Sequence, residues 1–138
     1  MESMKHELLL IKTFVTKERQ ERYLNLIATE KGRKKFRTYL SHFSDLNDKY
    51  CIPHSLVSYP QLYDLLKSEG APDVCYVISE NSKYDLKTLP IMDATKQLFN
   101  SGIAFFLSCV PGRLVYYEGE DSTRRFVLSA KSNHMYGK

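Results

Sequence analysis

The residues of this sequence best suited to chemistry are five basic side chains in the first third of the chain. They occupy five of the seven positions from 31 to 37, and they are Lys31, Arg33, Lys34, Lys35 and Arg37. Basic side chains that project together into solvent bind phosphates and release counterions, which gives affinity for nucleic acid. The cluster therefore predicts contacts with nucleic acid or another polyanion, such as an acidic protein surface. A solvated helix face is the alternative, because no helix-turn-helix, RNP or KH motif accompanies the cluster.

A second candidate site lies where two expected strands end. Glu80 follows the apolar segment 74–79, and Cys109 follows the apolar segment 103–108. Ligands bind beyond the carboxyl ends of parallel strands, so these two side chains should converge if the strands are parallel neighbours, with Arg113 close by. A carboxylate, a thiol and a guanidinium together make an acid–base or anion-binding site. The alternative is that these residues only end their strands and pack.

The histidines and the remaining acidic residues form no metal or cofactor motif. His54 lies beside Ser55 in a loop and is a further candidate base, although neighbours in sequence do not make a triad. No two histidines have the spacing of a helical zinc site. The acidic turn of Glu118, Glu120 and Asp121 lacks the further oxygens of a calcium loop and suits a hairpin. We expect neither a metal nor a cofactor.

Composition and charge narrow the class of protein. The chain has 138 residues, 43% of them hydrophobic and 26% charged, which excludes collagen-like, disordered and disulfide-rich proteins and suits one domain. The formal net charge is +4. Residues 12–38 hold nine basic and three acidic side chains, so this segment carries +6 and the rest of the chain −2. Such an asymmetry favours an anionic partner.

The cysteines and the N-terminal residues indicate the cellular compartment of the protein. Cys51, Cys75 and Cys109 are odd in number and widely spaced, so we expect three free thiols in a reducing environment. Only four consecutive apolar residues, 8–11, follow the polar start of the chain. That run is too short for a signal peptide or a membrane-spanning helix. The sequence therefore predicts a cytoplasmic protein that does not associate with membranes.

Apolar periodicity predicts a helical first half that positions the basic cluster. Leu8, Ile11 and Val15 have helical spacing, although residues 8–11 alone also suit a short buried strand. Thr16 and Thr29 are suited to cap the next two helices. The third helix has two faces, one apolar and one that carries all five basic side chains. A fourth helix is expected between residues 60 and 70.

In the second half the pattern changes to short apolar runs typical of strands. Strands are expected at 74–79, 103–108, 113–118 and 124–129, with a polar loop at 80–87, a helix from Pro90 to Gly102 and a Pro111-Gly112 turn. The strand–helix–strand unit should be a right-handed parallel crossover. We therefore expect an α+β fold, in which an N-terminal layer of three to four helices packs on a four-stranded mixed sheet. That sheet contains one β-α-β crossover followed by two antiparallel strands.

This fold divides one domain, residues 1–138, into three parts. Residues 1–70 are mainly the helical layer, residues 72–130 the sheet with its crossover helix, and residues 131–138 a flexible tail. Tyr116 and Tyr117 are neighbours in a strand, so they point to opposite faces, and one of them is available to face water.

The favoured function is a small binding module that contacts nucleic acid or another polyanion through the basic helix. This function needs no convergence of distant residues, so the sequence leans against an enzyme. Two alternatives remain open. One is a small hydrolase or nuclease that uses Glu80, Cys109, Arg113 and His54. The other is a protein-binding adaptor or regulatory subunit, of a toxin-neutralising type, whose partner contacts a sheet rich in tyrosine.

Overall fold

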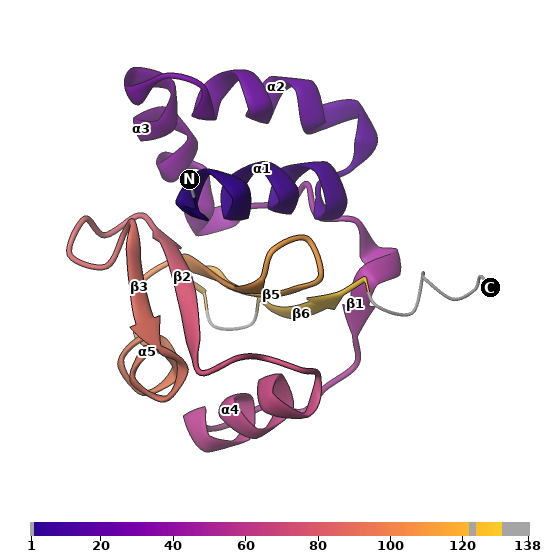
Figure 1. The fold of residues 1–138 in the computed structure, drawn as a ribbon, viewed down its shortest axis with the longest axis vertical. Helices are drawn as coiled ribbons and strands as arrows, with labels where there is room; N and C mark the ends of the chain where they lie inside the picture. Colours follow the sequence, from indigo (N-terminus) through magenta and orange to yellow (C-terminus); the bar gives the residue numbers. More distant parts are fainter. Residues whose placement is uncertain (1, 122–123, 131–138) are drawn as a thin grey trace.

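Helices cover both faces of the sheet in this protein (Figure 1). The computed structural model describes residues 2–121 and 124–130. In chain order the elements are α1 (Glu2–Phe14), α2 (Lys17–Ile27), α3 (Glu30–Thr38), the 3₁₀ turns η1 (Leu40–His42) and η2 (Asp48–Tyr50), β1 (Cys51–Ile52), α4 (Tyr59–Ser68), β2 (Val74–Ser79), β3 (Lys87–Pro90), α5 (Ile91–Leu98), β4 (Phe105–Val110), β5 (Leu114–Glu118) and β6 (Arg125–Ser129). Helices α1 to α3 lie on one side of the sheet, and α4 and α5 lie on the other. The expected tail at 131–138 falls outside the described residues.

The α+β class is confirmed, but the four-stranded mixed sheet is wrong. Among the described residues the sheet has six strands in the order β1-β6-β5-β4-β2-β3. All five pairings between them are antiparallel. The antiparallel β5 and β6 that the sequence predicts are confirmed, and so is the positive φ, 71°, at Gly112 in the turn before β5. Two short strands, β1 and β3, lie in segments for which the sequence predicts no strand.

The parallel crossover expected between segments 74–79 and 103–108 is wrong because β3 returns the chain along β2 before α5 begins. Leu86 has a φ of 67° and marks the turn, after which β3 pairs antiparallel with β2 until Pro90 lies opposite Val74. Helix α5 therefore starts at the beginning of β2, where the Ile91 N–H donates to the Asp73 carbonyl at 2.8 Å. It carries the chain back to the end of β2, so β4 must run antiparallel to β2.

The helices of the first half are largely as expected. Residues 8–11 are helical, as part of α1, and the Thr29 hydroxyl caps α3 by accepting from the Gly32 N–H at 2.9 Å. Thr16 precedes α2, but its side chain makes no capping hydrogen bond. Helix α4 does not join α1 to α3. It packs beside α5 on the opposite face of the sheet.

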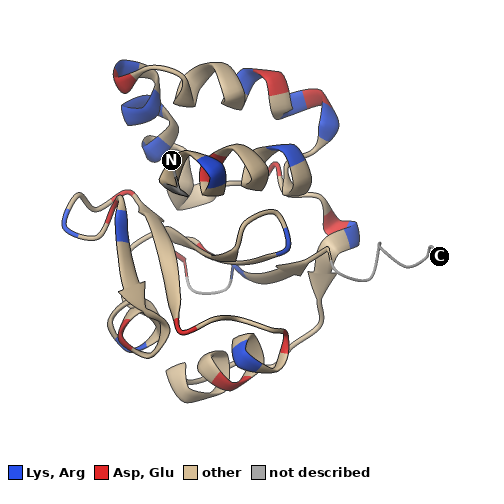
Figure 2. Ribbon diagram, in the orientation of Figure 1, with Lys and Arg blue, Asp and Glu red and all other residues tan. Residues whose placement is uncertain are grey.

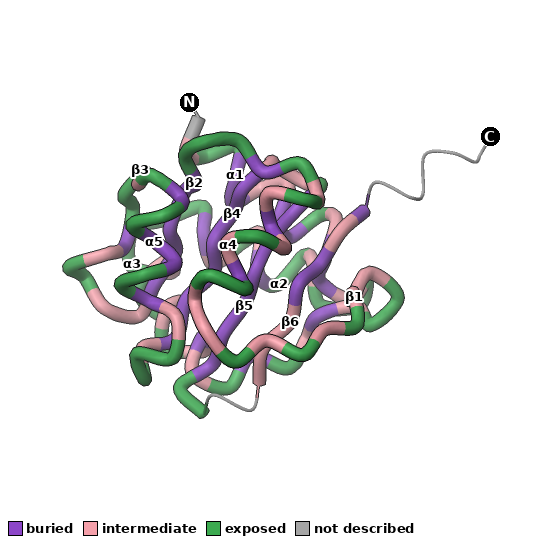
Figure 3. Tube along the Cα trace, turned by 90° about the horizontal axis from the view of Figure 1, so that it is seen from below, coloured by how far each residue is buried: buried purple, intermediate pink, exposed green. Residues whose placement is uncertain are grey.

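Two hydrophobic cores result, one on each face of the sheet, and they explain the two tyrosines of β5. Because successive side chains of a strand alternate, Tyr117 enters the core under α1 to α3, and Tyr116 enters the core under α4 and α5. Both rings are fully buried, so the expectation that one of them faces water is wrong. Figure 3 shows the central strands as the buried part of the molecule.

Candidate polyanion-binding surface

Helix α3 divides its basic residues between two faces. At 100° per residue, Lys31, Lys34 and Lys35 fall within an arc of about 100°, and all three are exposed. Arg33 and Arg37 lie on the other side of the helix and are only partly exposed. The expectation that all five side chains project into solvent is therefore wrong for the two arginines.

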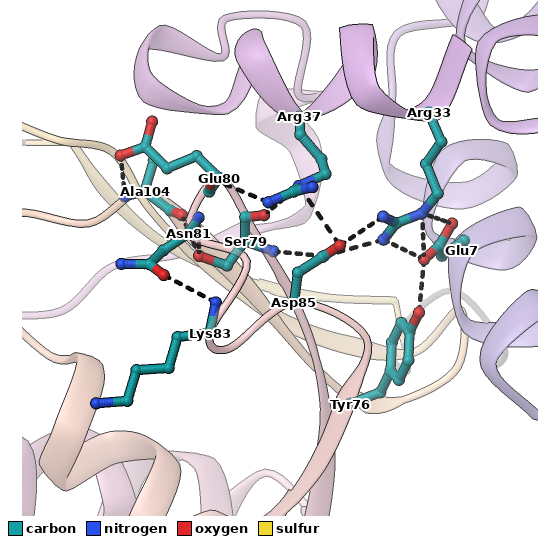
Figure 4. A network of polar contacts seen from close by, with 10 residues as sticks. All are labelled: Glu7, Arg33, Arg37, Tyr76, Ser79, Glu80, Asn81, Lys83, Asp85 and Ala104. Carbon is teal, nitrogen blue, oxygen red and sulfur yellow. Dashed lines mark hydrogen bonds and ion pairs between the residues drawn. The ribbon is translucent and has the colours of Figure 1, made fainter. Parts of the chain in front are cut away.

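Arg33 bridges two buried carboxylates that come from distant parts of the chain (Figure 4). Its Nε and Nη2 donate to Glu7 of α1 at 2.7–3.1 Å, and its Nη1 and Nη2 donate to Asp85 at 2.6 and 3.0 Å. The side chains of Arg33, Glu7 and Asp85 are 15%, 6% and 4% exposed. Burial alone would lower the pKa of Arg33, but the hydrogen bonds to Asp85 and Glu7 raise it above its ordinary value. Arg33 therefore fastens α3 to α1 and to the loop before β3.

Arg37 fastens the end of α3 to the end of β2. Its Nε donates to the Ser79 carbonyl at 2.8 Å, and its Nη2 donates to the Glu80 carbonyl at 3.1 Å. Asp85 supports the same corner, because it accepts from the Ser79 N–H at 3.0 Å and lies 3.4 Å from Arg37 Nε. Tyr76 completes the network by donating to Glu7 at 2.6 Å (Figure 4). Burial, and then the contact with Glu7, raise the pKa of Tyr76.

Sequence reasoning missed Glu7 and Asp85, and the helical wheel singles out only one of the two arginines. Arg33 falls about 20° beyond the apolar arc at Leu40, whereas Lys35 falls about 40° beyond the other end of that arc and Arg37 about 60° beyond Leu40. A basic residue at that border is suited to turn inward toward a carboxylate. Nothing in the sequence indicates that the carboxylates come from residues 7 and 85.

Two shallow grooves adjoin the lysine face at the end of α3. One, of about 410 Å³, is lined by Lys34, Arg37, Thr38 and Glu80. The other, of about 270 Å³, is lined by Arg22, Tyr23, Thr38, Tyr39, Ser41, His42, Phe43 and Ser44. Thr38 lines both grooves, so they meet there. In the second groove Arg22 lies over the Tyr39 ring at 5.2 Å and donates to its hydroxyl at 3.0 Å.

Exposed charge on α2 and α3 is predominantly positive. The exposed basic side chains there are Lys17, Arg19, Arg22, Lys31, Lys34 and Lys35, against the exposed acidic residues Glu18, Glu21 and Glu30. Figure 2 shows these segments on the outer helical layer, with red positions among the blue. The surplus of three positive charges lies on the two helices whose residues help to line the grooves, which favours an anionic ligand.

Glu80 brings an acidic group into the first groove. One of its carboxylate oxygens accepts from the Ala104 N–H at 3.0 Å. Burial, and next the adjacent carboxylate of Glu120, raise the pKa of Glu80, while His42 lowers it. Glu120 is held against η1 because its N–H donates to the Ser41 carbonyl at 3.2 Å. Two carboxylates and one imidazole thus gather beside the end of α3.

The other residues predicted for the strand-end site do not join Glu80. Because β2 and β4 are antiparallel, Glu80 lies at the opposite end of the sheet from Cys109. Arg113 is exposed in the turn before β5, and its N–H donates to the Val110 carbonyl at 2.9 Å. His54 donates from Nε2 to the Arg125 carbonyl of β6 at 3.0 Å. The expected convergence of Glu80 and Cys109, with Arg113 close by, is wrong because it required β2 and β4 to be parallel.

The remaining expectations concern cysteines, metals and membranes. Cys51, Cys75 and Cys109 are all free thiols, as expected. Within residues 2–121 and 124–130, no group of three or more His, Cys, Asp or Glu side chains is placed to hold a metal ion. None of the helices in the described part of the chain has the length and apolarity needed to cross a bilayer.

Comparison with known proteins finds no protein family model, no curated protein and no solved structure that matches this chain. Function is therefore inferred from the arrangement of the side chains.

Proposed function

We propose that this protein is a small binding module that contacts nucleic acid through Lys31, Lys34 and Lys35 of α3. The observation that carries the proposal is the exposure of these three lysines on one face of a helix whose two arginines are fixed inward. The arginines hold the helix at a defined position on the sheet. A rigid helix loses little conformational entropy when it binds a ligand. The lysines can therefore bind phosphates with only a small entropic penalty.

The grooves beside the lysines support the same function. Lys34 lines the first groove, and Arg22 and Tyr39 present a cation and an aromatic ring in the second. Cationic grooves with aromatic side chains are typical of surfaces that bind single-stranded nucleic acid, because bases stack on the rings while the cations follow the backbone. We also propose a cytoplasmic location, which the three free thiols support.

Replacing Lys31, Lys34 and Lys35 together with alanine is expected to weaken binding to mixed-sequence DNA and RNA at low salt. Each lysine that contacts a phosphate contributes about one counterion, so the slope of log affinity against log salt should fall by about three. A salt titration followed by fluorescence anisotropy measures this slope. The fold should be retained, because each of these exposed side chains contributes within about 0.5 kcal/mol to stability.

A second triple variant with the same change in charge is the control. Lys49, Lys87 and Lys96 are exposed and lie outside α2 and α3, so their replacement should leave most of the salt slope in place. If the salt slope fell equally in the two variants, binding would depend only on the net charge of the protein and not on the lysines of α3. Negligible binding by the wild type would leave the lysines as a solvated face, and an acidic protein would then be the partner to test.

A second candidate function is cleavage of RNA in the first groove, which the position of Glu80 favours. Glu80 lines the first groove beside Lys34. His42 lines the second groove and lowers the pKa of Glu80. In this mechanism a carboxylate takes the proton of the ribose 2′-hydroxyl as its oxygen attacks phosphorus. The 5′ oxygen leaves with a proton from the imidazole, and Lys34 offsets the charge that develops on the phosphate.

Substituting Glu80→Gln is expected to reduce RNA cleavage by a factor of about 10² or more, because general acid–base catalysis contributes that much. Binding to DNA of the same sequence should persist, since the lysines remain. The measurement is the rate of cleavage of an end-labelled RNA, with and without Mg²⁺. Cleavage by the Gln variant at the wild-type rate, or none by the wild type, would remove this candidate and leave the binding function intact.

A further inference from the structure

A mainly apolar pocket lies at the opposite end of β2 from the lysine face. It has a volume of about 540 Å³, which falls in the range of small-molecule sites. Its lining is mainly apolar and includes Val74, Val110 and Pro111, together with His6 and two thiols, those of Cys75 and Cys109. Neither proposed function uses this pocket.

The two thiols are brought together by the register of the sheet. Tyr76 of β2 is the partner of Ser108 in β4, and Cys75 and Cys109 are the adjacent residues at the same end of this antiparallel pair. The two thiols are in hydrogen-bonding contact. This contact, together with burial, raises the pKa of Cys109 well above its usual range.

This contact places the two thiols within reach of each other. Residues directly opposite in an antiparallel pair have Cα atoms about 4.5–5.5 Å apart. Disulfides join residues whose Cα atoms are about 4.4–6.8 Å apart. The two distance ranges overlap, so a disulfide suits neighbouring positions on adjacent antiparallel strands. Cys75 and Cys109 are only 2% and 3% exposed, and both residues line the pocket, so we expect a small oxidant to reach them through it.

We propose that Cys75 and Cys109 form a redox modification site, which a small peroxide entering the pocket converts to an intramolecular disulfide. One thiolate attacks the peroxide O–O bond and becomes a sulfenic acid, while the leaving hydroxide takes up a proton to form water. The second thiol then attacks the sulfenic sulfur, the S–S bond forms and a second water leaves. Two thiols are oxidised, and one molecule of hydrogen peroxide is reduced to two of water.

Cys51 provides an internal control. It lies on β1 and is separated from β4 by β6 and β5, so it cannot reach either member of the pair within one molecule. Treatment of the whole protein with hydrogen peroxide should reduce the number of free thiols from three to one. The mass of the monomer should fall by two hydrogen atoms, and a non-reduced digest should contain one peptide pair that links Cys75 to Cys109.

The variants test whether the pair and the pocket act as proposed. Cys75→Ser and Cys109→Ser should each abolish the loss of two hydrogens, whereas Cys51→Ser should retain it. Val74 lines the pocket and is 46% exposed, so Val74→Trp should slow disulfide formation while leaving the product unchanged. The non-reduced digest of the wild-type protein tests for the bond between Cys75 and Cys109 even if a serine variant fails to fold. A cross-link through Cys51, or sulfinic acid at Cys75 or Cys109 without a disulfide, would overturn the proposal.

Discussion

Replacing Arg33 with alanine is expected to lower the free energy of unfolding by about 3–5 kcal/mol, the usual cost of removing one partner from a buried ion pair. The guanidinium makes hydrogen bonds to both Glu7 and Asp85, and each carboxylate is almost inaccessible to water. Without Arg33, two buried negative charges would lose their main counter-charge. The loss should exceed that expected for any surface lysine of the same helix.

Urea unfolding followed by circular dichroism measures this loss, and Lys34→Ala is the matched control. Lys34 follows Arg33 directly, carries the same charge and is exposed, so its replacement should change stability by about 0.5 kcal/mol or less. Arg33→Lys should give an intermediate loss, because an ammonium keeps the charge but cannot pair with two carboxylates in fixed geometry. This variant remains informative if the alanine variant is unfolded. Similar stabilities for Arg33→Ala and Lys34→Ala would falsify the structural role of Arg33.

Phe36→Ala is expected to cost about 3–5 kcal/mol of stability through lost packing. Phe36 is 1% exposed and projects from α3 into the core above the sheet. Its ring lies edge-on to Tyr23 of α2 at 5.7 Å and to Phe43 at 6.3 Å. Truncation therefore leaves a cavity among rings that cannot easily close around it, since Tyr23 is also tied by its hydroxyl to Asp45.

The measurement is again the free energy of unfolding, with Phe36→Leu as the comparison. Leucine fills most of the volume, so its cost should be well below that of alanine. A loss under about 1 kcal/mol for Phe36→Ala would contradict the packing described here. Nucleic-acid binding by folded Phe36→Leu should match the wild type, because Phe36 does not contribute to the exposed face of α3.

The features of this fold that could be predicted from sequence are those encoded locally. The Thr29 cap and the strand at 74–79 each depend on residues a few positions apart, and the structure confirms them. The direction of β4 depends instead on β3, which gives no such signal. Residues 87–90 hold one apolar residue and end in proline, a composition that argues against a strand. Without β3, the sequence predicts a direct crossover from segment 74–79 to segment 103–108, which the antiparallel pairing of β2 and β4 contradicts.

The candidate site could be predicted only in part, for a related reason. Lys31, Lys34 and Lys35 are exposed because of their angle on one helix, which the sequence determines. The inward contacts of Arg37 depend on backbone carbonyls at the end of β2, more than 40 positions away. The sequence predicts that Glu80 lies beyond the end of a strand, and β2 does end at Ser79. The residues that surround Glu80 depend on the directions of the strands, which no local sequence pattern indicates.

The two outermost strands also bear on how this protein behaves at high concentration. A free strand edge is a template for pairing with another molecule. On β3 that template is only four residues long, carries the exposed Lys87 and ends at Pro90, which has no N–H to donate. On β1 it is two residues long, and Pro53 follows at once. Neither edge of the native sheet is therefore suited to pair with a strand of another molecule. Aggregation of this protein should begin from unfolded chains rather than from folded ones.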